Sequence, residues 1–188
     1  GVYRGDQLTD IPLAIRIRKL FGWMGAMPDN QLLAVRTRLL WHDTPLTPWS
    51  MTRSVPDGRW DEWIEFRGRT IAECRGEMRV EVTVGSASGG IRFHATRSIV
   101  DEHGLVCHGL YRLLLQSGSE ESAVEPSRFE RFLKRYEMSR ERIPWLDDAA
   151  FGVVSRLQLE EAEAQQRLYL IIEFPKFDCP VSINQDVE

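Results

Sequence analysis

The first two-thirds of the sequence alternates apolar and polar residues in short runs that are separated by turn-forming residues. Residues 13–18 and 33–39 alternate apolar side chains with arginines, and residues 78–84 form the most regular run. A period of two places successive side chains on opposite faces of a strand, so each run predicts a strand with one buried face. Further strands are predicted at residues 60–66, 91–95, 110–115 and 168–174, with an edge strand or an irregular stretch at 46–52. Many short strands with turns between them predict a mainly β fold, either a sandwich or a barrel.

The pattern changes after residue 116. Residues 117–122 are polar and are typical of a linker. Apolar residues then recur at helical spacing, at Phe129, Phe132, Leu133 and Tyr136. A second helix is predicted to begin near the acidic residues 147–148 and to run to residue 164. We therefore predict a helical hairpin at residues 119–167, inserted between two strands of a single domain that spans residues 1–188.

Composition narrows the classes of function. The 188 residues are 43% hydrophobic and 28% charged, with a formal net charge of −4, as in an ordinary globular protein. Nucleic-acid binding needs clustered positive charge, so we expect no nucleic-acid partner. The apolar run at residues 168–172 is much shorter than the roughly 20 residues that cross a bilayer. Three widely spaced cysteines, Cys74, Cys107 and Cys179, predict a reducing compartment, and Gly1 in place of methionine predicts a piece of a longer chain.

Known catalytic signatures are missing from the sequence. It contains no nucleophile elbow, no zinc-protease motif and no P-loop. His103, Cys107 and His108 are the one cluster with metal-ligand residue types, and we interpret it as a turn because a second ligand pair is missing. The acidic residues at 57–62 and 101–102 do not supply the converging oxygens that calcium needs. We predict no catalytic residue, metal site or cofactor site in this chain.

Two surfaces have residue types suited to binding. The first surface consists of the alternating arginines Arg16, Arg18, Arg36 and Arg38. They form either a face that binds anionic lipid headgroups or the solvated face of an antiparallel sheet. The aromatic stripe of the predicted helix either contacts a partner or packs on its own neighbour. The residues alone leave both pairs of alternatives open.

Three segments, in chain order, resemble the C2 domains of phosphatidylinositol 3-kinases. Residues 35–37 and 45–47, followed by R-W-D-E-W-I at 59–64, are similar to a core that reads R-W-N-E-W-L in the family. Residues 100–110 are similar to its F-x-x-x-G-x-x-x-x-G-x-x-x-L stretch. I-P-W-L-D at 143–147 with Phe151, followed by L-Y-L-I-I-E-F at 168–174, resembles V-x-W-L-D-R-x-x-F … M-Y-L-x-V-E-F. That last pairing is characteristic of the class III enzyme, which makes phosphatidylinositol 3-phosphate.

The resemblance implies an antiparallel eight-stranded C2-type β-sandwich, with a helical hairpin inserted between its last two strands. It implies a non-catalytic scaffold that docks the regulatory pseudokinase subunit and the Beclin-type subunit of the class III complex. The candidate contacts lie in and beside the hairpin helices, at Phe129, Phe132, Tyr136 and Trp145. The alternative is a calcium-independent C2 module that binds anionic lipids through the four arginines.

The resemblance also places the chemistry outside these residues. The parent chain would be a lipid kinase that uses ATP with Mg or Mn in a separate kinase domain. The motifs of that domain, D-x-H-x-x-N and D-F-G, are absent from the sequence. The implied location is cytoplasmic and peripheral on endosomal or autophagic membranes, in vesicle trafficking.

Overall fold

A computed structural model describes residues 2–4, 10–22, 25, 31–86, 89, 92–117 and 156–183. Most of these residues form strands, so the predicted mainly β fold is confirmed. The long strands are β2 (Pro12–Gly22), β3 (Leu33–Trp41), β6 (Arg59–Thr70), β7 (Met78–Ser86), β8 (Arg92–Ser98), β9 (Gly109–Ser117) and β10 (Leu168–Phe174). The short elements are β1 (Val2–Tyr3), β4 (Thr44–Pro45), β5 (Ser50–Met51), the 3₁₀ turn η2 (Ile71–Glu73), the helix α2 (Arg156–Ala164) and β11 (Lys176–Phe177).

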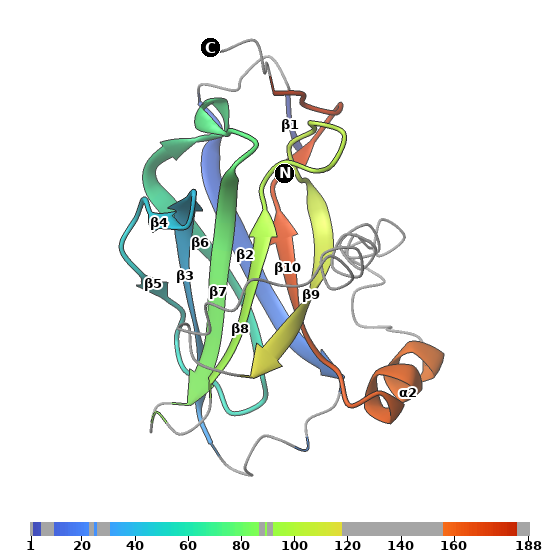
Figure 1. The fold of residues 1–188 in the computed structure, drawn as a ribbon. Helices are drawn as coiled ribbons and strands as arrows, with labels where there is room; N and C mark the ends of the chain where they lie inside the picture. The colour runs from blue at the N-terminus through green and yellow to red at the C-terminus, as the bar shows by residue number, and fades with distance from the viewer. Residues whose placement is uncertain are drawn as a thin grey trace.

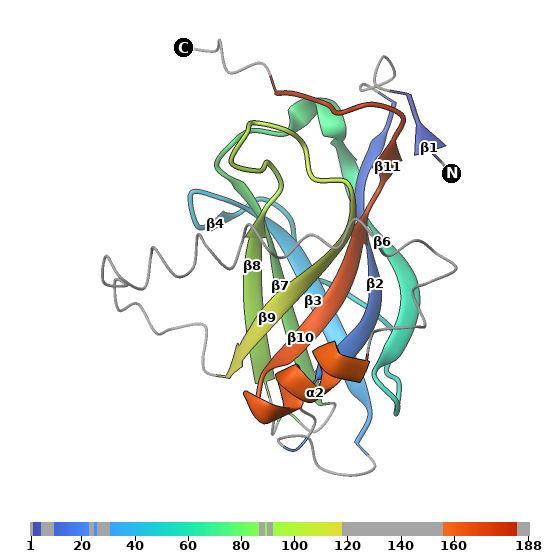
Figure 2. The same cartoon turned by 90° about the vertical axis from the view of Figure 1, so that its right-hand side faces the viewer.

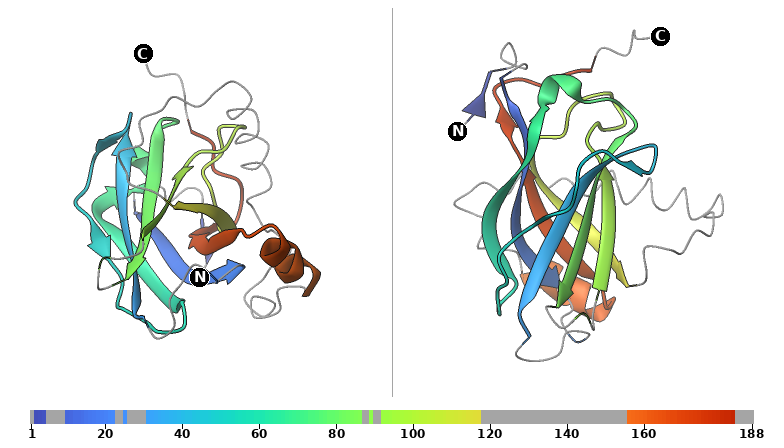
Figure 3. Two further views of the ribbon diagram at one scale, coloured as in Figure 1. Left: turned by 60° about the horizontal axis from the view of Figure 1, so that its bottom comes forward. Right: turned by 90° about the vertical axis from the view of Figure 1, so that its left-hand side faces the viewer.

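One antiparallel sheet curls on itself to form a half-barrel (Figures 1 and 3). Its strand order is β4-β3-β7-β8-β9-β10-β2-β6, and β5 also pairs with β3. The ladder between β8 and β9 is short and pairs Phe93 with Ser117 and His94 with Gln116. The sheet bends at this ladder, which leaves β3, β7 and β8 on one side of the core and β9, β10, β2 and β6 on the other.

The strand count differs from the eight strands that the resemblance implies. The described residues form a nine-stranded sheet and a separate parallel ribbon, in which β1 pairs with β11. The long strands of the described residues belong to one sheet, which continues through the short ladder between β8 and β9. The antiparallel arrangement is confirmed, and the C2-type sandwich stays a prediction.

The core lies between the two sides of the curled sheet. Alternate residues of each strand supply it, as the period of two predicts. Its largest fully buried side chains include Trp60, Phe66 and Phe174. Burial of each such side chain contributes about 1.5–3 kcal/mol, so these aromatic residues stabilise the contact between the two sides.

A β-bulge at Arg18 changes which residues of β2 face the core. Before it, the odd-numbered residues from Leu13 to Ile17 are in the core, whereas after it Leu20 is in the core and Phe21 belongs to a second cluster. The pairing of β2 shifts register at this point against both β6 and β10. An extra residue in one strand shifts the alternation by one position. The bulge therefore gives β2 two apolar faces, one on the core and one beneath α2.

The chain leaves the sheet at the end of β9 and returns beside it in β10. The two strands are antiparallel neighbours, with Leu115 opposite Leu168. Just before the return, α2 packs on the outer face of the sheet, where Ala162 joins a cluster with Phe21, Leu110, Tyr169 and Ile171 (Figure 2). The rest of the predicted hairpin, residues 119–155, lies outside the described residues, so the hairpin stays a prediction.

Candidate functional site

A buried ion-pair network crosses the outer face of β10, β2 and β6. Arg18 Nη1 donates a 2.7 Å hydrogen bond to Oε1 of Glu173, and both side chains are almost fully buried. The Nε atom of Arg18 lies 2.8 Å from Oδ1 of Asp61, a carboxylate that is 55% exposed. That contact lacks the alignment of a hydrogen bond. The charge of Arg18 is thus balanced by one buried and one exposed carboxylate.

Arg16 lies next to this network. It is paired across the strands with Glu173 on one side and Trp63 on the other. Its Nη1 atom is 3.6 Å from Glu173 Oε1, and its guanidinium carbon is 6.0 Å from the centre of the Trp63 ring. Its Nε atom is shielded from solvent and has no hydrogen-bond partner among the residues that the structure describes. On the other side, Lys176 Nζ lies 3.8 Å from Glu173 Oε2.

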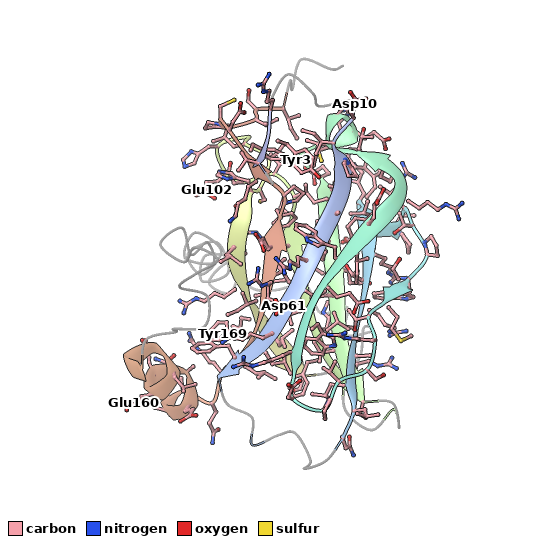
Figure 4. The ribbon with its side chains drawn as sticks, turned by 180° about the vertical axis from the view of Figure 1, so that it is seen from behind. Tyr3, Asp10, Asp61, Glu102, Glu160 and Tyr169 are labelled. Atoms are coloured by element: carbon pink, nitrogen blue, oxygen red, sulfur yellow. The ribbon has the colours of Figure 1, made fainter. Side chains whose placement is uncertain are left out.

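These residues border a cleft at one end of the sheet. The cleft has a volume of about 480 Å³ and lies between the β1–β11 ribbon and the outer face of β2 and β6. Figure 4 shows this side of the molecule, with Tyr3 in the β1–β11 ribbon, Asp61 midway along the sheet and Tyr169 near α2. The outer face is therefore divided into a charged region beside the cleft and an apolar region under the helix.

Arg36 and Arg38 lie on the outer face of β3, on the other side of the core. Both guanidinium groups lie over the ring of Trp49, at 4.6 Å and 4.0 Å from its centre. Arg38 Nε also donates a 2.6 Å hydrogen bond to Glu81 Oε1, and His94 Nε2 is 3.3 Å from the other oxygen of that carboxylate. This side of the sheet has its own cluster of charged and aromatic residues.

The structure does not bring the four predicted arginines onto one face. Arg16 and Arg18 lie on β2 and Arg36 and Arg38 on β3, in opposite halves of the strand order. All four point away from the core, because the alternate residues of both strands fill it. A fully solvated face is wrong for Arg18, because Glu173 and Asp61 hold a side chain that is only 6% exposed.

Of the histidine and cysteine cluster, His103 lies in a turn, whereas Cys107 and His108 lie beyond it. Asp101 Oδ1 accepts hydrogen bonds from the backbone N–H groups of His103 and Leu105. His103 is exposed, whereas Cys107 is buried. Within the described part of the chain, no group of three or more potential ligands is placed to hold a metal ion.

Two buried cysteines lie in the core rather than in a reactive site. Burial, with a smaller contribution from Cys107, raises the pKa of the Cys74 thiol to about 12. Burial also raises the pKa of Cys107, although the nearby cation of Arg97 opposes the shift. Arg97 itself is buried, with its guanidinium carbon 4.1 Å from the centre of the Tyr111 ring. A thiol with a raised pKa is a poor nucleophile near neutral pH, so neither cysteine has the properties of a catalytic residue.

The four predicted partner contacts, Phe129, Phe132, Tyr136 and Trp145, lie outside the described residues. The fold also gathers Trp63, Glu173 and Lys176 at the cleft, and none of the three was a predicted site residue. One signal for Glu173 was present, because it is the single charge in an otherwise apolar strand, where a buried carboxylate needs a partner.

Comparison with known proteins gives no identification. Neither a protein-family profile nor a curated protein sequence matches this chain. Among the helical residues that the structure describes, none form a helix long and apolar enough to cross a membrane.

Proposed function

We propose that this chain is the non-catalytic C2 domain of a class III phosphatidylinositol 3-kinase, and that it docks regulatory subunits. The observation that carries the proposal is the adjacency of β9 and β10, which are paired from Leu115–Leu168 to Gly109–Phe174. Residues 118–167 lie between these neighbouring strands in the sequence. An insertion between the last two long strands is what the resemblance implies for the docking hairpin.

The packing of α2 supports this proposal. Ala162 is buried against Phe21 and Tyr169 on the outer face of the sheet. Gly22 approaches the segment closely, since a Cβ atom built there would lie 2.4 Å from the carbonyl oxygen of Arg167. The end of the insertion is thus packed on the sheet. The proposed partners are the regulatory pseudokinase subunit and the Beclin-type subunit.

Under this proposal the chain positions the kinase domain and does not itself catalyse the reaction. The parent kinase phosphorylates phosphatidylinositol in a separate domain, with ATP and Mg or Mn as its cofactors. The C2 domain and its insertion hold that domain in the complex on endosomal or autophagic membranes.

A deletion that respects the packing of α2 tests the proposal. Residues 119–155 are replaced by a flexible Gly-Ser linker, which keeps Ala162 on the sheet. We expect the variant to keep the urea midpoint of the original chain and to lose co-purification with both regulatory subunits. Co-purification that survives the deletion, or an original chain that binds neither subunit, contradicts the proposal.

Point variants make the same test without shortening the chain. Combined replacement of Phe129, Phe132 and Tyr136 by serine removes the predicted aromatic stripe. The matched control replaces Arg131 and Arg135, which lie off that stripe, by serine. We expect the aromatic variant to lose binding to the subunits and the arginine variant to keep it.

Lipid binding through the four arginines has less support. The two arginine pairs lie on different sides of the core, and Arg18 and Arg38 each donate a hydrogen bond to a buried carboxylate. Sedimentation with anionic vesicles at low and physiological salt tests this alternative. Salt-sensitive binding that is lost in the Arg36→Gln, Arg38→Gln double variant would favour it.

A further inference from the structure

The cleft beside the β1–β11 ribbon has the dimensions and lining of a binding site. Its volume of about 480 Å³ lies in the range of sites that hold a small molecule or a few residues of a peptide. Ala14, on the outer face of β2, is a small residue in its lining. Aromatic and cationic side chains also line it, including Tyr3, Trp63, Arg16 and Lys176.

Arg16 supplies an unused donor at this cleft. Its Nε–H group is shielded from water and has no hydrogen-bond partner among the described residues. The nearest carboxylate, Glu173, is 3.6 Å from Nη1 and already accepts the shorter hydrogen bond from Arg18. A buried donor without an acceptor is unfavourable, and an oxygen ligand removes that cost.

The other charges at the cleft select the kind of anion. Arg16 and Lys176 are positive, whereas Glu65 and Glu173 are negative and line the same cleft. A phosphate dianion would lie beside these two carboxylates and would be repelled by them. A single carboxylate matches the planar fork of an arginine without adding a second negative charge.

The aromatic residues of the cleft indicate which kind of molecule carries the bound carboxylate. Trp63 is 48% exposed and Tyr3 is 38% exposed, although both are large and partly apolar. Exposed aromatic side chains beside a charged group are typical of sites that bind peptides. We propose that the cleft binds an acidic residue of a partner protein, with its carboxylate on Arg16 and a neighbouring apolar side chain on Trp63 or Tyr3. This inference does not depend on the proposed C2 function.

Nuclear magnetic resonance of the arginine side chains tests the proposal directly. The probe is the acetylated and amidated tripeptide Leu-Glu-Leu, added to the ¹⁵N-labelled chain, and the readout is the Nε–H resonance of Arg16. We expect that resonance to move downfield as it gains an acceptor. We expect the Leu-Gln-Leu and Leu-phosphoserine-Leu peptides to bind about tenfold more weakly, since a charged hydrogen bond is lost or repulsion is added.

Three variants separate binding from folding. Arg16→Gln removes the donor, and Ala14→Leu fills the cleft without changing any charge. Arg36→Gln is the matched control, because Arg36 also lies over a tryptophan but on the other side of the core. We expect the first two variants to lose about tenfold or more in affinity and the control to bind normally, with melting curves confirming that each is folded.

Several results would overturn the proposal. They are equal binding of the glutamate and glutamine peptides, tighter binding of the phosphoserine peptide, and unchanged affinity in the folded Ala14→Leu variant. Binding of phosphatidylserine vesicles that requires Arg16, without binding of the glutamate peptide, would also overturn it by assigning the cleft to a lipid headgroup.

Discussion

Arg18 of β2 and Glu173 of β10 form a hydrogen-bonded ion pair between residues 155 positions apart in the sequence. Both side chains lie on the outer face of the sheet, and yet each is at least 94% shielded from solvent. The pair lies at the β2 bulge, where the register against β10 shifts. A buried charge needs its partner, so this contact helps to specify how β10 is aligned with β2.

Loss of Glu173 should destabilise the protein strongly. Glu173→Leu leaves the buried guanidinium of Arg18 without its hydrogen-bonded carboxylate, and we expect a loss of about 3 kcal/mol in the free energy of unfolding. Asp61→Asn changes the exposed partner of the same arginine and should cost less than about 1 kcal/mol. Urea unfolding measures both values. Equal costs for the two variants would show that burial does not control this network.

Gly22 should not tolerate a side chain. It has φ = +108°, and an added Cβ would lie 2.4 Å from a backbone oxygen of Arg167. Gly22→Ala should therefore reduce the free energy of unfolding by about 2 kcal/mol or more. Gly68→Ala is the control, because Gly68 also has a positive φ but its added Cβ meets no atom within 4 Å. Its cost should be about 1 kcal/mol, measured in the same unfolding series.

Two tryptophans of β6 should differ in their effects on stability. Trp60 is buried in the core, where its Nε1–H donates a hydrogen bond to the carbonyl of Arg53, whereas Trp63 is on the outer face. Trp60→Ala should cost about 4 kcal/mol, and Trp63→Ala about 0.5 kcal/mol or less. Thermal and urea unfolding of the two variants compare them. A large loss in Trp63→Ala would indicate that this side chain supports the fold rather than the cleft.

Stability should fall at alkaline pH because of Cys74. Its pKa is about 12 in the folded protein, compared with an ordinary value of 9.0. Above pH 9 the unfolded chain releases the thiol proton while the folded protein keeps it, so rising pH favours unfolding. The stabilisation is complete below pH 9 and is lost by about 1.4 kcal/mol per pH unit as the pH rises toward 12. Urea unfolding under reducing conditions from pH 8 to 10.5 should show a shallower decline in Cys74→Ala, and parallel declines would contradict this assignment.

The sequence predicted the positions of the long strands well, but it predicted the burial and contacts of side chains on the outer face of the sheet less well. Alternation located β2, β3, β6 and β7, because a half-buried strand imposes a period of two on its residues. It could not locate the bulge at Arg18, since an extra residue matters only when the neighbouring strands are known. Alternation also could not show which outward-facing side chains are exposed to solvent. Arg18 faces outward and is nevertheless buried.

The cleft could not be predicted from the sequence for a related reason. Its residues come from three distant parts of the chain, namely β1 and β2, β6, and the segment of β10 and β11, and β1 meets β11 through their pairing. No local pattern marks such a site. Trp63 belongs to an alternating run in which Trp60 and Phe66 are buried, and the register of β6 decides which aromatic residue remains exposed.

The last long strand of the chain occupies an interior position in the sheet. β10 lies between β9 and β2, and all seven of its residues are buried. During synthesis, β9 and β2 can pair with β8 and β6, but each must wait for residues 168–174 to pair its second edge, and until then both present an open edge to other chains. The sheet therefore cannot close until residues 168–174 have been made, however early its other strands fold.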